Sequence, residues 1–69
     1  MNIQTVFGDN VKKYRIELGL SQEKLAELAG LHRTYISAIE CYRRNISLCN
    51  VQQIASALNI EPYKLLKED

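Results

Sequence analysis

Hydrophobic residues recur at intervals of three and four along most of this chain, the spacing that lines one face of a helix. No segment alternates polar and apolar residues over the length that a β-strand needs. The apolar face of the first helical segment is predicted at Val6, Phe7, Val11, Tyr14 and Leu18. The pattern therefore predicts an all-α fold and indicates which side of each helix is buried.

Two short helices are predicted next, over Gln22–Ala29 and Arg33–Glu40. Ser21 precedes the first of them and can cap its N–H groups, while Gly30 follows it and can adopt the positive φ of a sharp turn. The inner face of Gln22–Ala29 is expected at Leu25, Leu28 and Ala29. The same periodicity predicts that the inner face of Arg33–Glu40 holds Ile36 and Ile39.

With Ile36 and Ile39 facing inward, the opposite face of Arg33–Glu40 is polar and is made of Arg33, Thr34, Ser37 and Ala38. Two helices joined by a tight glycine turn are the sequence form of a helix-turn-helix. In that motif the first helix braces the second, so that the second lies in the major groove of DNA. The outer face of Arg33–Glu40 is therefore the predicted DNA-reading surface.

Two further helical segments follow a polar connection over residues 41–46. Ser47 can cap the fourth helix, and Pro62 favours the first turn of a fifth, short helix over Pro62–Lys67. The apolar face of the fourth helix is expected at Leu48, Val51, Ile54, Ala55 and Leu58. The whole chain is thus predicted to form one domain, a compact five-helix bundle that contains the helix-turn-helix.

The composition, 69 residues of which 46% are hydrophobic, is that of a single small globular domain. The net charge of +1 gives no sign of a nucleic-acid partner. Between residues 31 and 47, however, three arginines (Arg33, Arg43 and Arg44) and one glutamate (Glu40) give a local net charge of +2. Such a segment suits a focused phosphate-contacting surface, although a solvated loop would give the same pattern.

Cys41 and Cys49 are the only cysteines, and the sequence offers no Cys/His cluster with the spacing of a zinc site. We expect both cysteines near the core, as small apolar residues. No apolar run approaches the roughly 20 residues of a membrane span, and no signal segment is evident. We therefore expect a cytoplasmic protein with reduced cysteines, without membrane attachment and without a cofactor, metal or small-molecule ligand.

The segment Leu18–Glu40 resembles the helix-turn-helix domains of phage repressor and Cro proteins, which have the lambda-repressor-like fold. The matching positions are Ser21-Gln22, Leu25-Ala26, Ala29-Gly30, Tyr35-Ile36-Ser37, Ile39-Glu40, Asn45-Ile46-Ser47-Leu48 and Ile54-Ala55-x-Ala57-Leu58. Within that family, two strings look like the controller proteins of bacterial restriction-modification systems, namely Arg33-Thr34-Tyr35-Ile36-Ser37 and Arg44-Asn45-Ile46-Ser47-Leu48. The resemblance implies a homodimeric regulator that binds palindromic operators in double-stranded DNA. It also implies control of the regulator's own gene and of the endonuclease gene, with activation at low occupancy and repression at high occupancy.

The helix-turn-helix layout nominates the residues that contact DNA. Arg33 stands at the start of the recognition helix, where its guanidinium can pair with both O6 and N7 of guanine. The predicted base-contacting residues are Arg33, Thr34, Tyr35 and Ala38. The predicted phosphate-contacting residues are Gln22, His32, Ser37, Arg43, Arg44, Asn45 and Ser47. Several of these roles have alternatives. Arg33 can be a solvent-facing arginine, Gln22 an ordinary helix former, and Ala38 a small residue that only allows close approach. Tyr35 can be a half-buried aromatic that supports the helix, and His32 can cap the recognition helix. The phosphate contact of Gln22 is implied by the resemblance.

The chain departs from the family just after the recognition helix. The family usually has a glycine two residues after the position of Glu40, and this chain has Tyr42 there. A tyrosine adopts the left-handed backbone conformation poorly. We therefore expect either a longer third helix or a turn in which Asn45 takes that conformation.

Two sets of residues are candidates for contacts with protein partners. The dimer-interface candidates are Ile46, Tyr63, Leu65 and Leu66, which can alternatively close the core of the monomer. Glu23 and Glu27 lie on the bracing helix, on the face through which related phage activators contact RNA polymerase.

Other functions fit the sequence less well. A phage-type repressor or an antitoxin-like autoregulator is the alternative among DNA-binding proteins. A protein-interaction module is the alternative outside them, but the outer face of Arg33–Glu40 lacks the apolar anchors typical of a docking surface. An enzyme is not expected, because the sequence has no carboxylate pair, activated nucleophile, phosphate loop or metal cluster.

Overall fold

The computed structural model describes residues 1–68, which form four α-helices and one 3₁₀ turn and contain no strand. In chain order the elements are α1 (Ile3–Glu17), α2 (Gln22–Ala29), α3 (Arg33–Glu40), α4 (Leu48–Leu58) and η1 (Pro62–Leu65). The predicted all-α helix-turn-helix fold is confirmed. The predicted fifth helix is wrong in kind, because Pro62–Leu65 makes only a single 3₁₀ turn.

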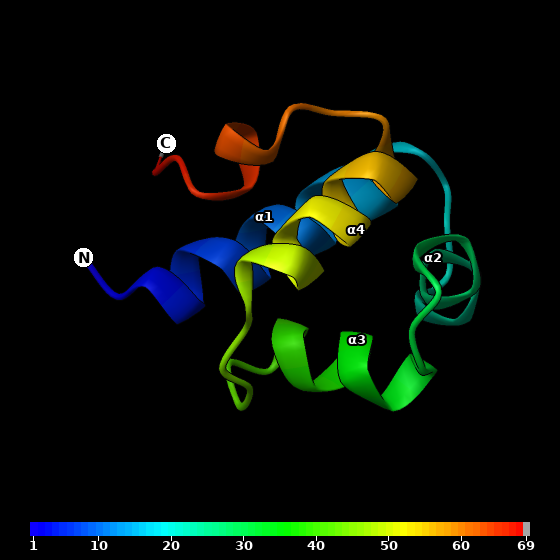
Figure 1. The fold of residues 1–69 in the computed structure, drawn as a ribbon, viewed down its shortest axis with the longest axis horizontal. Coiled ribbons are helices and arrows are strands. Elements are labelled where there is room, and N and C mark those ends of the chain that lie inside the picture. The colour runs from blue at the N-terminus through cyan, green and yellow to red at the C-terminus, as the bar shows by residue number, and fades with distance from the viewer. Residues whose placement is uncertain (69) are drawn as a thin grey trace.

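The recognition helix and the C-terminal turn lie at opposite edges of the molecule. In Figure 1, α3 runs along the lower edge, and η1 lies at the upper edge beyond α1 and α4. Helix α3 packs against α1 and α2, whereas η1 packs against α1 and α4. The molecule measures 29 × 21 × 20 Å. Within residues 1–68, no helix has the length and apolar character needed to cross a membrane.

One hydrophobic core connects all five elements. Its largest fully buried side chains are Phe7, Val11, Leu25, Ile36, Ile39, Ile54, Leu58 and Leu65. Ile36 and Ile39 insert from α3 as predicted, and this fixes the rotation of α3 about its own axis. The opposite face of α3 is therefore turned away from the core.

The predicted start signals of α2 and α4 are confirmed. The Ser21 hydroxyl accepts the Lys24 N–H at 2.9 Å, and the Ser47 hydroxyl accepts the Asn50 N–H at 3.1 Å. Each bond satisfies a backbone donor that the helix itself leaves unpaired. Gly30 takes a φ of 73°, so the turn between α2 and α3 uses the left-handed conformation that glycine adopts at low cost.

Three leucines that were predicted on buried helix faces are exposed. Leu18 and Leu48 are 54% and 84% exposed, because Leu18 caps the end of α1 and Leu48 is the first residue of α4. Leu28 is 51% exposed because the buried face of α2 is centred on Leu25 and Ala29, which places Leu28 on its flank. Periodicity alone does not reveal where a helix end leaves the core.

The turn after α3 differs from both sequence-based alternatives. Tyr42 itself adopts the left-handed conformation, with a φ of 62°, so α3 does not run on and Asn45 does not take that role. The Tyr42 hydroxyl donates a hydrogen bond to the Asp9 carboxylate, and this bond raises the pKa of Tyr42. Cys41 and Cys49 are both exposed, so the prediction that they lie near the core is wrong. They stand at the end of α3 and in the first turn of α4, both away from the packed helix faces.

Candidate nucleic-acid interface

The outer face of α3 borders an open hollow with a volume of about 290 Å³. Its lining residues are Arg33, Thr34, Ser37, Ala38, Cys41 and Arg43. Four of them are the outer-face residues predicted from the periodicity of α3, and Arg43 adds a second guanidinium from the following loop. Cys41 belongs to this surface as well, which its apolar character did not suggest.

An ion-paired network holds α3 against α1 and α2. The guanidinium of Arg15 donates to both carboxylate oxygens of Glu40, at 2.7 and 3.0 Å. Their side chains are only 13% and 4% exposed, and the Glu40 carboxylate raises the pKa of Arg15. The same guanidinium donates to the Leu20 carbonyl at 2.8 Å. This network was missed in the sequence because its members are far apart in the chain.

Gln22 lies between this network and solvent. Its amide nitrogen donates to Glu40 at 3.1 Å, and the residue is half-buried at the start of α2. An amide nitrogen carries two protons, and Glu40 accepts one of them. The contact with Glu40 therefore orients the Gln22 side chain and is compatible with donation of the second proton to a phosphate.

Tyr35, on α3, connects this helix to the following loop and to α4. It is half-buried, its hydroxyl donates to the Asn50 side chain, and the Arg44 guanidinium lies over its ring at 4.4 Å from the centroid. This geometry agrees with the interpretation of Tyr35 as a supporting aromatic. It also stacks Arg44 against a rigid surface next to the recognition helix.

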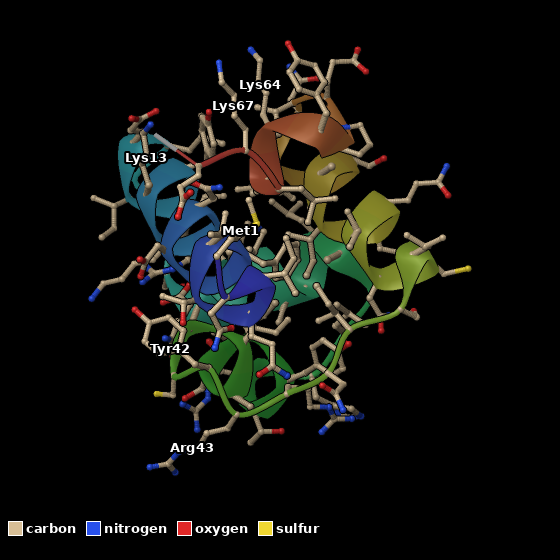
Figure 2. All side chains as sticks on the ribbon, turned by 90° about the vertical axis from the view of Figure 1, so that its left-hand side faces the viewer. Met1, Lys13, Tyr42, Arg43, Lys64 and Lys67 are labelled. Carbon is tan, nitrogen blue, oxygen red and sulfur yellow. The ribbon has the colours of Figure 1, made fainter. Side chains whose placement is uncertain are left out.

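The remaining loop residues lie along the same edge as α3. Arg43, Arg44 and Asn45 are exposed, and Figure 2 shows Tyr42 and Arg43 at the end of the molecule away from Lys64 and Lys67. The Asn45 side-chain oxygen accepts a hydrogen bond from Gln4 at 2.6 Å, and Ser47 caps α4. His32 occupies the N-cap position of α3, as the capping alternative expected, but its side chain makes no capping hydrogen bond.

The acidic residues of α2 are accessible. Glu23 and Glu27 are both exposed, and Glu27 makes a solvent-facing ion pair with Lys24 at 3.4 Å. An exposed pair of this kind contributes little to stability. The α2 surface is therefore available to a partner.

The dimer-interface candidates differ in how far their side chains are exposed to solvent. Tyr63 is 61% exposed, whereas Ile46 and Leu66 are half-buried at the edge of the core. Leu65 is fully buried, so it closes the core of the monomer and cannot meet a second subunit. Its side chain points inward because the 3₁₀ turn packs against both α1 and α4.

Comparison with known proteins places this geometry in a family. The helix-turn-helix family matches residues 11–65. Control protein C.SmaI of Serratia marcescens is 47% identical over 66 residues, which cover 96% of this chain and 79% of that protein. The crystal structure of the restriction-modification controller protein C.AhdI from Aeromonas hydrophila is 45% identical, with a TM-score of 0.87 and coverage of 90% of this chain and 94% of that one.

A third similar protein was solved as a DNA complex. The restriction-modification controller protein C.Esp1396I bound to a 19 base pair DNA duplex is 32% identical, with a TM-score of 0.86. The match covers 94% of this chain and 87% of that one. This chain belongs to the helix-turn-helix family, and within it to the controller proteins of restriction-modification systems.

Proposed function

We propose that this chain is a sequence-specific transcription regulator that binds a palindromic operator in double-stranded DNA as a homodimer. The observation that carries the proposal is the outer face of α3, where Arg33 and three small or polar side chains border an open hollow. An α-helix fits the major groove of B-DNA, which is about 12 Å wide. The similar C.Esp1396I was solved bound to a 19 base pair DNA duplex, which supports double-stranded DNA as the partner.

The proposed contacts divide into base-reading and phosphate-binding groups. Phosphate contacts fix the register of a protein on the duplex, and contacts to base edges give sequence preference. The proposed base-contacting residues are Arg33, Thr34, Tyr35 and Ala38, of which Tyr35 would act through its ring because its hydroxyl is bonded to Asn50. The proposed phosphate-contacting residues are Gln22, His32, Ser37, Arg43, Arg44, Asn45 and Ser47.

The homodimer is proposed to form through Tyr63, Leu66 and Ile46. Tyr63 is a large aromatic side chain that is 61% exposed, the kind of residue that anchors protein interfaces. A two-fold axis would place two recognition helices about 34 Å apart, which is one turn of DNA. The two-fold symmetry is the reason for a palindromic operator, and the spacing sets the distance between its half-sites.

The regulated genes are proposed from the family. The similar proteins C.SmaI and C.AhdI are a control protein and a restriction-modification controller protein. By analogy, this chain would act in the cytoplasm on its own gene and on an endonuclease gene, activating at low occupancy and repressing at high occupancy.

Arg43→Ala is expected to weaken binding to every DNA sequence and to lower the salt dependence of binding. Each lost phosphate contact should reduce the slope of log K against log salt by about one unit per bound subunit. Titration of a duplex at several salt concentrations measures this slope. Lys67→Ala removes the same charge at the opposite end of the molecule (Figure 2) and should leave the slope unchanged. An unchanged slope in Arg43→Ala would remove Arg43 from the phosphate-binding group.

Glu27→Lys is expected to abolish transcription activation and to retain operator affinity. Glu27 is exposed on α2, and its carboxylate is proposed to meet RNA polymerase. A reporter assay and a DNA titration of the same variant separate the two effects. Glu17→Lys makes the same charge change at an exposed site on α1 and should keep both activities. Loss of activation together with operator binding in Glu27→Lys would contradict the proposed contact.

A further inference from the structure

Helix α1 lies directly under the turn that follows α3. The backbone of Tyr42 is in the left-handed conformation, which tyrosine adopts poorly. The Tyr42 hydroxyl donates a hydrogen bond to the Asp9 carboxylate. Gly8 makes room for this contact, since a Cβ at Gly8 would lie 2.9 Å from the Tyr42 ring and 2.5 Å from the Ile39 carbonyl oxygen. The ring of Tyr42 therefore covers a backbone position that only glycine fits.

A second tether reaches the same loop from the preceding turn of α1. The Gln4 amide donates to the Asn45 side-chain oxygen at 2.6 Å and to the Arg44 carbonyl at 3.3 Å. Gln4 and Gly8 are four residues apart and therefore share one face of α1. The loop is thus held to this face at its beginning and in its middle.

The held turn has its own backbone signature. The Arg43 N–H donates to the Ala38 carbonyl at 2.9 Å, and the Tyr42 N–H donates to the Ile39 carbonyl at 3.1 Å. This pair of hydrogen bonds is the Schellman motif, in which the residue just after the helix end, here Tyr42, has a left-handed backbone. The Arg43 amide proton therefore reports whether Tyr42 keeps its conformation.

We propose that Gln4, Gly8 and Asp9 are positioning residues for DNA binding, which act through Tyr42 and Asn45 to hold Arg43 and Arg44 in place. We call these three residues of α1 the loop clamp. The inference rests on the proposed function, in which both arginines contact phosphate. Residues 43–47 have no regular secondary structure, so an untethered loop would lose conformational entropy when DNA orders it. A loop that is ordered beforehand binds more tightly with the same contacts.

The first test removes the tethers and keeps both arginines. Tyr42→Phe deletes the hydroxyl, and Gln4→Met keeps the length of the side chain while deleting its donor. The double variant should bind roughly 3- to 10-fold more weakly. The factor should be the same on the palindrome selected from random DNA and on a scrambled duplex, because phosphate contacts carry no sequence information. The salt slope should stay unchanged, since the charges remain.

The second test separates the hydrogen bond to Asp9 from the charge of Asp9. Asp9→Asn and Asp9→Ala both remove a carboxylate, but only the asparagine retains an oxygen that accepts the Tyr42 hydroxyl. Asp9→Ala should therefore bind more weakly than Asp9→Asn, and it should add no further loss to Tyr42→Phe. Tyr14→Phe, which deletes a tyrosine hydroxyl from α1 and leaves Tyr42 intact, is the matched control for Tyr42→Phe.

The third test is made without DNA. Hydrogen exchange of the Arg43 amide should quicken in the double variant, while exchange of the Ile39 amide inside α3 keeps its rate. Unchanged affinity in the double variant, or an affinity loss with equally faster exchange throughout α3, would overturn the clamp. Failure of the unmodified chain to bind either duplex would overturn the proposed function and with it the role of the clamp in DNA binding. Exchange at Arg43 would still show whether the tethers order the turn.

Discussion

Replacing Glu40 with alanine is expected to lower the free energy of unfolding by roughly 3–5 kcal/mol. The substitution removes the acceptor of two Arg15 hydrogen bonds and one Gln22 hydrogen bond. The Arg15 guanidinium, which is only 13% exposed, then keeps the Leu20 carbonyl as its one hydrogen-bond acceptor within residues 1–68. An uncompensated charge at such a site is the reason for the large loss.

Urea denaturation of the purified variant measures this loss. The hydrophobic core of a 69-residue chain rarely supplies more than about 3–5 kcal/mol of stability, so Glu40→Ala should be near the point of unfolding. Glu17→Ala, which removes an exposed carboxylate from α1, should change the stability by less than about 0.5 kcal/mol. If Glu40→Ala lost less than about 1 kcal/mol, the ion pair would not be what secures α3.

Arg33→Ala is expected to weaken operator binding by about 1–3 kcal/mol and to relax the base preference at one position in each half-site. Arg33 is exposed at the first position of α3 and lines the hollow on its outer face. Its planar fork suits guanine, which presents two acceptors in the major groove. Binding to a set of duplexes that differ at single positions measures both effects.

Arg33→Lys separates charge from geometry. Lysine keeps the positive charge but cannot form the two parallel hydrogen bonds of a guanidinium. Compared with Arg33→Ala, Arg33→Lys should therefore regain electrostatic attraction to the DNA phosphates but not the preference for one base. If Arg33→Ala lost affinity equally on all sequences, Arg33 would be a phosphate contact instead. Restoration of the full base preference by lysine would also contradict the proposed pairing.

The recognition helix could be predicted because its signals are local. Ile36 and Ile39 set which face is buried, and Ser21 and Gly30 mark where the bracing helix starts and ends. Each signal acts within a few residues of the chain. The bounds of α2 and α3 and the exposed outer face of α3 follow from them.

The contacts that hold α3 in place could not be predicted in the same way. Arg15 and Glu40 are 25 residues apart, and Tyr42 and Asp9 are 33 apart, so no short pattern connects them. The left-handed conformation of Tyr42 goes against its intrinsic preference and accompanies packing against Gly8. The direction of Leu65 also depends on tertiary packing, since η1 must close over the core.

Selection of random duplex DNA by the purified protein, at roughly physiological salt, tests the central claim most directly. The proposed function predicts enrichment of a palindrome whose half-site centres are about 34 Å apart, one turn of the helix. Arg33→Ala should recover the same palindrome with one position relaxed in each half. Recovery of no enriched sequence by a folded protein would contradict a sequence-reading dimer, and a single unrepeated half-site would contradict the two-fold arrangement.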